Sequence, residues 1–258
     1  HHAPRYLTNN MALRNRMAIL GETFSHDRFY KRIHAGNAFI EEILEYTHVH
    51  GAEIRRINRE ADARVAGMAP GAEQGVAFTM VPRDEPLDLL SYSYIPYSTE
   101  DGGTDYVRSS ELVVIEDVAN YNAFEPIRTA LRPSAYVFSA AFTGLAEKLR
   151  QHGIAVETLE ADSTFDVEVY RVTGLGKQDY VQNGHRNTLL EGRFQRDNRS
   201  FSRGDYLVSM DTRLANLIFY LLEPESDDGL AYWNLFDSYL EAELQRQGTA
   251  DYPVYKLF

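Results

Sequence analysis

The sequence contains no cysteine among its 258 residues. This absence excludes disulfide bonds, thiolate metal sites and cysteine nucleophiles. It leaves the compartment open, because a chain of this size can fold without covalent cross-links. No apolar run approaches the roughly 18 residues of a membrane-spanning helix, and the opening residues His1 to Arg5 lack the basic head and apolar stretch of a signal peptide. We therefore expect no membrane span.

Basic side chains are also scarce. The chain has 26 Lys and Arg against 38 Asp and Glu, a formal net charge of -12. Such a field repels phosphate backbones and anionic lipid surfaces, so nucleic acid is not an expected partner. By contrast, 44% of the residues are hydrophobic, and 13 Phe and 17 Tyr favour strands and packed sheets. The composition predicts a folded protein with a core of its own.

The first third of the chain predicts the end of an α/β domain. Residues Met11 to Glu22 alternate and then become apolar, a pattern typical of a strand that is buried on both faces. Ser25 and Asp27 are suited to cap a helix or helix pair that ends near Gly67. The Gly- and Pro-rich stretch 66–74 then breaks the periodicity. We place a boundary there between a domain at 1–67 and a second domain at 75–258.

The second domain is predicted to be a mixed, β-rich α+β unit. Strands are expected at 76–81, 91–95, 112–115, 136–139, 154–159, 165–172 and 205–209, with helices at 145–152, 213–222 and around 230–244. Helices among strands favour a mixed sheet over a pure sandwich. The terminal residues 252–258 are apolar and aromatic, so we expect this end to dock on the fold.

Two groups of motifs, in order, resemble one known family. The stretches Pro4–Asn9, Ala12–Arg16 and Ile19–Thr23 resemble the last catalytic strand of bacterial carboxypeptidase A-like zinc peptidases. The stretches Glu191–Arg193, Gly204–Val208, Leu221–Gly229, Trp233–Phe236 and Tyr252–Tyr255 look like the C-terminal extension of a large bacterial branch of that family. The resemblance touches both ends of the chain, although only the first group of motifs holds chemistry.

The resemblance implies a zinc metallocarboxypeptidase, a hydrolase of C-terminal peptide bonds, whose catalytic carboxylate is Glu22. It implies that Arg5 and Tyr6 lie near the C-terminus of the bound peptide, where an arginine fork and a tyrosine suit a carboxylate. The family binds zinc through a His-x-x-Glu pair and a later histidine, all upstream of the glutamate. No such region precedes Glu22, so this segment would supply the glutamate while a missing N-terminal half supplies the zinc ligands.

Several further motifs have simpler interpretations. His50-Gly51-Ala52-Glu53 has zinc-ligand spacing, but it follows Glu22 on a predicted helix, so we interpret it as a solvated helix face. Gly174-Leu175-Gly176-Lys177 lacks the spacing of a phosphate loop and is interpreted as a turn. The acids between Glu223 and Asp228 are expected to cap the next helix. Arg14 and Arg16 are expected to form salt bridges with a neighbouring element.

Two other functions stay open on sequence grounds. The tyrosine-rich β domain could be a non-catalytic module that binds peptide or cell-wall material. The chain could also be an inactive homologue with a structural role. A periplasmic or extracellular location agrees with the resemblance. His1 and His2 are equally consistent with native sequence and with a tag, and we expect the chain to be cut from a longer one.

Overall fold

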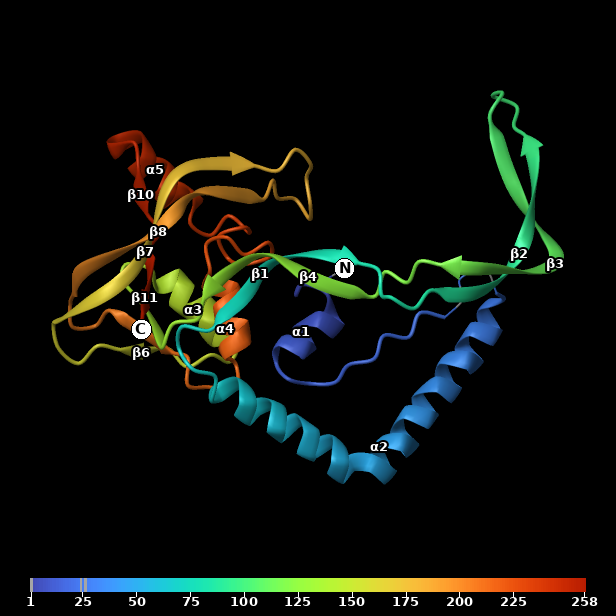
Figure 1. Cartoon of the computed structure of the whole chain (residues 1–258), viewed down its shortest axis with the longest axis horizontal. Coiled ribbons are helices and arrows are strands. Elements are labelled where there is room, and N and C mark those ends of the chain that lie inside the picture. Colours follow the sequence, from blue (N-terminus) through green and yellow to red (C-terminus); the bar gives the residue numbers. More distant parts are fainter. Residues whose placement is uncertain (1, 24, 26) are drawn as a thin grey trace. The chain divides into compact units, whose positions relative to one another are not determined.

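The structure, a computed structural model, describes residues 2–23, 25 and 27–258. The chain divides into two compact units. One contains the residues up to Ala77 together with Ile127–Phe258, and the other is Phe78–Pro126. The elements of both are drawn in Figure 1. The domains predicted from the sequence at 1–67 and 75–258 divide the chain differently and stay a prediction.

The N-terminal segment begins with a short helix instead of the predicted strand. Helix α1 spans Leu7–Leu13 and is followed by Asn15, whose φ of 57° is left-handed. Asparagine tolerates this conformation, which commonly terminates helices. Residues 16–22 then run as coil. The predicted buried strand at 11–22 is therefore wrong, because a strand needs neighbours to pair with and no strand of the described residues pairs with this segment.

Helix α2 spans Phe29–Ala66 and is followed by Gly67, as predicted. Its N-terminus has no side-chain cap: Asp27 accepts a hydrogen bond from the backbone N–H of Arg28, the N-cap residue, at 2.8 Å. The expected capping of the helix by Asp27 is thus not formed. Among the described residues of α2 only Val65 is buried. Among its described residues, α2 therefore packs into the hydrophobic core only near its C-terminal end.

The second unit is built on one antiparallel ribbon. Strand β2 (Leu87–Ser98) pairs with β3 (Thr104–Val118), and the pairing contains two irregularities, between Leu87 and Leu89 and between Tyr92 and Tyr94. Strands β1 (Glu73–Val81) and β4 (Ala123–Leu131) form a separate two-stranded sheet that leads into and out of this unit.

The largest sheet lies in the first unit. Its strands follow the order β10-β7-β11-β5-β9-β6, and β8 pairs with β7 along a long ribbon (Figure 1). Their bounds are β5 Ala135–Phe138, β6 Glu157–Thr158, β7 Ser163–Lys177, β8 Thr188–Phe201, β9 Tyr206–Ser209, β10 Ala250–Asp251 and β11 Val254–Leu257. Each of the pairings resolved in this sheet is antiparallel.

Three helices complete the core of this unit: α3 (Thr143–Gln151), α4 (Ala215–Leu222) and α5 (Asp237–Gln247). Helix α4 is apolar on every side and every one of its residues except Asn216 is buried, as expected for a helix in a protein interior. The core cluster also includes Phe138, Tyr170 and Tyr252. None of the helices in the described part of the chain combines the length and apolar character needed to cross a bilayer.

Much of the secondary structure predicted for residues 75–258 is confirmed. Helices α3 and α4, the strands at β1, β2, β3, β5, β7 and β9, and the docked C-terminus agree with the sequence. Strands β4 and β8 were not predicted. Residues 174–177 belong to strand β7, so their interpretation as a turn is wrong. Residues 230–236 form turns, and the last helix begins only at Asp237. The fold is mixed α/β, and the carboxypeptidase-like domain arrangement stays a prediction.

Candidate functional site

Glu22 lies in the coil between α1 and α2, with its side chain exposed. The neighbouring Gly21 packs against α2 so closely that a Cβ there would lie 2.7 Å from the ring of Phe39. Glycine therefore lets the backbone beside Glu22 approach the helix. The predicted position of Glu22 at the rim of a buried strand is not formed, whereas its predicted role as a catalytic carboxylate stays a prediction.

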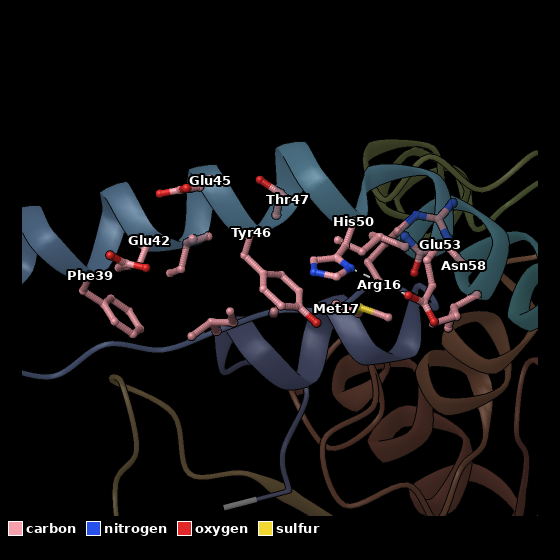
Figure 2. A pocket seen from close by; sticks show the side chains of 15 residues that line it. Arg16, Met17, Phe39, Glu42, Glu45, Tyr46, Thr47, His50, Glu53 and Asn58 are labelled. Carbon is pink, nitrogen blue, oxygen red and sulfur yellow. Dashed lines mark ion pairs between the residues drawn. The ribbon is translucent and has the colours of Figure 1, made fainter.

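A large apolar groove lies between this coil and α2. Its volume is about 870 Å³, and its walls come from residues 16–19 and from one face of the helix between Phe39 and Asn58. Figure 2 shows Phe39 and Tyr46 pointing from α2 toward the segment that carries Met17. Met17, Ile19 and Leu20 are each more than half exposed. The segment before Glu22 is thus apolar but barely covered.

One polar clamp holds the coil to the helix. The guanidinium of Arg16 donates to both carboxylate oxygens of Asp62, at 2.8 and 3.0 Å, and Asn15 donates to the same carboxylate at 3.1 Å. The hydrogen bond from Arg16 holds the pKa of Asp62 below its usual value. The expected salt bridge of Arg16 is confirmed, although it forms from a coil and not from a strand.

Arg5 is held by a buried carboxylate. The Asp228 side chain, only 1% exposed, accepts a hydrogen bond from the backbone N–H of Arg5 at 2.9 Å and forms an ion pair with its guanidinium. The indole Nε1 of Trp233 donates to the same carboxylate at 2.8 Å. Although partial burial opposes the charge, Asp228 raises the pKa of Arg5 above its usual value. Sequence reasoning missed this partner of Arg5.

Tyr6 and Trp233 complete the surroundings of this arginine. The guanidinium carbon lies 5.3 Å from the Tyr6 ring centre and 5.6 Å from that of Trp233. A cavity of about 330 Å³ is lined by Arg5 and Trp233 and also by Lys148, His152 and His185. Arg5 and Tyr6 are thus brought together at the C-terminal part of the fold, whereas Glu22 lies beyond α1 beside α2. Their shared role in binding a peptide carboxylate stays a prediction.

The acids between Glu223 and Asp228 have partners inside the fold instead of capping a helix. Glu223 is buried, accepts a hydrogen bond from the Tyr136 hydroxyl at 2.6 Å, and pairs with Lys256 at 3.2 Å. Burial raises the pKa of Glu223, and Lys256 opposes that shift. Asp227 pairs with His2 at 2.7 Å. The predicted capping role is therefore wrong, because helix α5 begins nine residues after Asp228, at Asp237.

The residues present do not fit a zinc site. Within residues 2–23, 25 and 27–258 there is no group of three or more His, Asp or Glu side chains that could hold a metal. His50 and Glu53 lie 3.9 Å apart on α2 as a solvated pair, and the helix continues through Gly51. A tetrahedral zinc site needs at least three protein ligands. A helical His-x-x-Glu pair alone does not provide them.

Comparison with known proteins links part of the chain to carboxypeptidases. The protein named carboxypeptidase 2 of Trichophyton rubrum is 27% identical over 119 residues, which are 46% of this chain and 22% of that protein. The proteins of the same name from Trichophyton tonsurans and Trichophyton equinum are 27% identical over 115 residues, 45% of this chain and 21% of theirs. The chain spans about a fifth of the length of these curated relatives.

No family model matches the chain, and no solved structure matches it. The similarities support a relationship to carboxypeptidases over slightly less than half of the chain. The motifs and these similarities thus agree that the chain is related to carboxypeptidases. The bacterial zinc branch and the position of the chain as a C-terminal half stay predictions.

Proposed function

We propose that this chain is the C-terminal part of a zinc-dependent metallocarboxypeptidase, which removes C-terminal residues from peptides in the periplasm or outside the cell. The similarity to the Trichophyton carboxypeptidases carries the proposal. The zinc ligands belong to a segment outside this chain, because the described residues do not fit a zinc site. The isolated chain is then inactive, and its partners are the missing N-terminal half and the peptide substrate.

Glu22 is the proposed catalytic carboxylate. In peptide hydrolysis a carboxylate takes a proton from the attacking water and passes it to the leaving amine. Glu22 is exposed, on a coil that follows an apolar stretch, so its side chain is free to enter a site that a second segment completes. The close approach of Gly21 to Phe39 ties this coil to α2 and limits where Glu22 can lie.

The groove between residues 16–19 and α2 supports the need for a second segment. Its wall carries exposed apolar side chains, among them Tyr46 at 61% and Ile19 at 63% exposure (Figure 2). An apolar surface of this extent is unusual on a free-standing protein and is typical of a surface that other protein covers. We propose that the missing half of the catalytic domain packs there, next to Glu22.

Arg5 and Tyr6 are proposed to bind the C-terminal carboxylate of the peptide. Asp228 already neutralises much of the charge of Arg5, so its contribution to carboxylate binding is smaller than that of a free arginine. Asp228 also accepts a hydrogen bond from the backbone N–H of Arg5, which holds the backbone next to Tyr6 in place. In this proposal the C-terminal part of the fold positions the substrate-binding end of the segment.

The decisive experiment replaces Glu22 by Gln in the full-length parent enzyme. We expect kcat to fall by about 100-fold or more, the range for loss of a general base, with the zinc content unchanged. The matched control is Glu41→Gln, which removes an exposed carboxylate from α2 that does not line the groove. The control should retain full activity. Near-normal turnover of Glu22→Gln at full zinc occupancy would show that another group is the base.

A further inference from the structure

The ribbon formed by β2 and β3 has no core of its own. Its strands pair only with each other in the described part of the chain. None of their residues is buried. A two-stranded hairpin is marginally stable in water unless a further strand or another surface covers one of its faces. This ribbon is therefore an element that needs a partner.

One face of the ribbon carries exposed apolar side chains on both strands. Residues paired across the strands share a face, and every second residue of a strand returns to it. The pairs Leu90↔Val114, Tyr92↔Leu112, Tyr94↔Arg108 and Pro96↔Tyr106 therefore lie together. The exposed members Leu90, Tyr94, Tyr106, Leu112 and Val114, which we call the ribbon face, are 58–70% exposed. The arginine of this face stacks on Tyr92, at 4.4 Å.

The opposite face is interrupted by polar contacts. Ser93 hydrogen bonds to Ser109, and Glu111 accepts a hydrogen bond from Ser93 at 3.2 Å. These groups satisfy one another in the middle of the strands. The middle of the ribbon face carries Arg108, which stacks on Tyr92, and Ser110. The apolar side chains of the ribbon face are 58–70% exposed, whereas those of the opposite face (Leu89, Ile95, Tyr97, Val107 and Ile115) are 43–55% exposed, so the ribbon face has more apolar surface to bury.

The two edges of the ribbon also differ. Strand β2 contains Pro96, which has no N–H to donate, and prolines of this kind protect a sheet edge from further pairing. Strand β3 has 15 residues and no proline. Its outer edge is therefore the one that can accept a further strand.

The charge of this unit selects the kind of partner. Phe78–Pro126 contains ten acidic and two basic side chains, a formal net charge of -8 within a chain of -12. Six of the ten acids lie near the two ends of the ribbon, as Asp84 and Glu85, Glu100 and Asp101, and Glu116 and Asp117. A second copy would bring two rims of like charge together, which disfavours self-association. A basic rim on the partner would match this one.

We propose that the β2–β3 ribbon is a docking element for a protein that presents a basic, amphipathic strand. That strand pairs with the outer edge of β3 and lays its apolar side chains along the ribbon face, while its Lys and Arg side chains meet the acidic ends. In such strand addition, main-chain hydrogen bonds supply affinity and alternate side chains supply specificity. This activity is independent of peptide hydrolysis.

The test uses the complete 258-residue chain and two capped peptides of about eight residues, one alternating valine with lysine and one alternating valine with glutamate. We expect the lysine peptide to bind and to protect the amides of β3 from hydrogen exchange. The glutamate peptide should bind at least about tenfold more weakly. Raising the ionic strength from about 0.01 M to about 1 M shortens the Debye length from about 30 to about 3 Å. This change should weaken the binding of the lysine peptide.

Two matched variants locate the contact. Leu112→Thr keeps a good strand former but removes apolar surface from the ribbon face, and Ile115→Thr makes a comparable change on the opposite face. We expect Leu112→Thr to lower the affinity for the lysine peptide by roughly tenfold and Ile115→Thr to leave this affinity nearly unchanged. Circular dichroism and amide protection without peptide report whether either variant alters the ribbon itself.

Several results would overturn the proposal. Equal binding of the two peptides, or binding that salt does not weaken, would show that charge does not select the partner. A lack of lysine-peptide binding, with no added protection of β3, would show that the edge does not accept a strand. Sedimentation that reveals a dimer of the chain, dissolved by Leu112→Thr, would assign the ribbon face to a second copy instead.

Discussion

Single side chains in this protein take their roles from partners far away in the sequence. Arg5 is fixed by Asp228, and Arg16 by Asp62. The sequence, through its resemblance to carboxypeptidases, placed Arg5 near a peptide carboxylate, a ligand that an arginine fork suits. It gave no sign that a buried aspartate more than two hundred residues later occupies the same guanidinium. The nearest signal was the acid cluster at 223–228, which was assigned to helix capping.

The clamp between Arg16 and Asp62 yields a prediction for the dependence of stability on pH. Because the hydrogen bond from Arg16 lowers the pKa of Asp62 in the folded state, the clamp contributes stability above the ordinary aspartate pKa of about 4 and loses it as the pH falls through the lower folded value. Arg16 is partly exposed, so solvent screening limits the contribution to about 1 kcal/mol or less.

Asp62→Asn should therefore lower the free energy of unfolding by up to about 1 kcal/mol at neutral pH and by much less near pH 3, as measured by urea denaturation. Hydrogen exchange of residues 14–20 should accelerate in the same variant. Glu60→Gln is the control, because it removes an exposed carboxylate that pairs with Arg56 on the same helix. An equal loss at both pH values would mean that the clamp does not stabilise through its charge.

At the scale of elements, α2 and the β2–β3 ribbon are the two that expose most of their apolar surface. Helix α2 has Phe29, Leu44 and Val49 exposed by 74%, 63% and 67%. Elements α3 and α4, in contrast, bury theirs. A helix with the periodicity of a core element but without a core is expected where its packing partner is supplied by other protein.

Tyr46→Ala tests this explanation for α2, because Tyr46 lines the groove that the proposed second half covers. In the isolated chain the side chain is largely exposed, so we expect the free energy of unfolding to change by no more than about 0.5 kcal/mol. In the full-length parent enzyme the free energy of unfolding should fall by about 3–5 kcal/mol, the usual cost of truncating a buried aromatic side chain.

The internal comparison is Leu240→Ala on α5, a leucine that is fully buried in this chain. Leu240→Ala should lower the free energy of unfolding by about 2–5 kcal/mol both in the isolated chain and in the parent enzyme. If Tyr46→Ala lowers the free energy of unfolding of the parent enzyme only slightly, the groove is not covered there.

At the scale of the whole molecule, we expect the isolated chain and the proposed full-length enzyme to differ in their zinc content. Because the described residues do not fit a zinc site, we expect the purified 258-residue chain to hold well under one equivalent of zinc after dialysis, by elemental analysis. The full-length parent should hold about one. Tight, stoichiometric zinc in the isolated chain that His50→Ala abolishes would instead place a site on α2.

The secondary structure of the C-terminal part was largely predictable because its strands and helices satisfy local patterns within one core. The alternation in β7 and the apolar run in α4 both match the structure. Strand β8 was missed because its charged, arginine-rich sequence lacks alternation, and it forms by pairing with β7 along its whole length. Strand β8 therefore forms because of its backbone pairing with β7 and not because of a pattern in its own side chains.

The sequence by itself determined the lack of thiol chemistry, the acidic balance, the extent of α2 up to Gly67 and the motifs that resemble carboxypeptidases. These follow from residue chemistry and from contacts a few positions apart. Only the tertiary structure decided that residues 11–22 form a helix and coil, that Asp228 holds Arg5, and that the β2–β3 ribbon stands uncovered. Strand pairing, ion pairing and burial each depend on groups distant in the sequence, and local pattern cannot specify which of them meet.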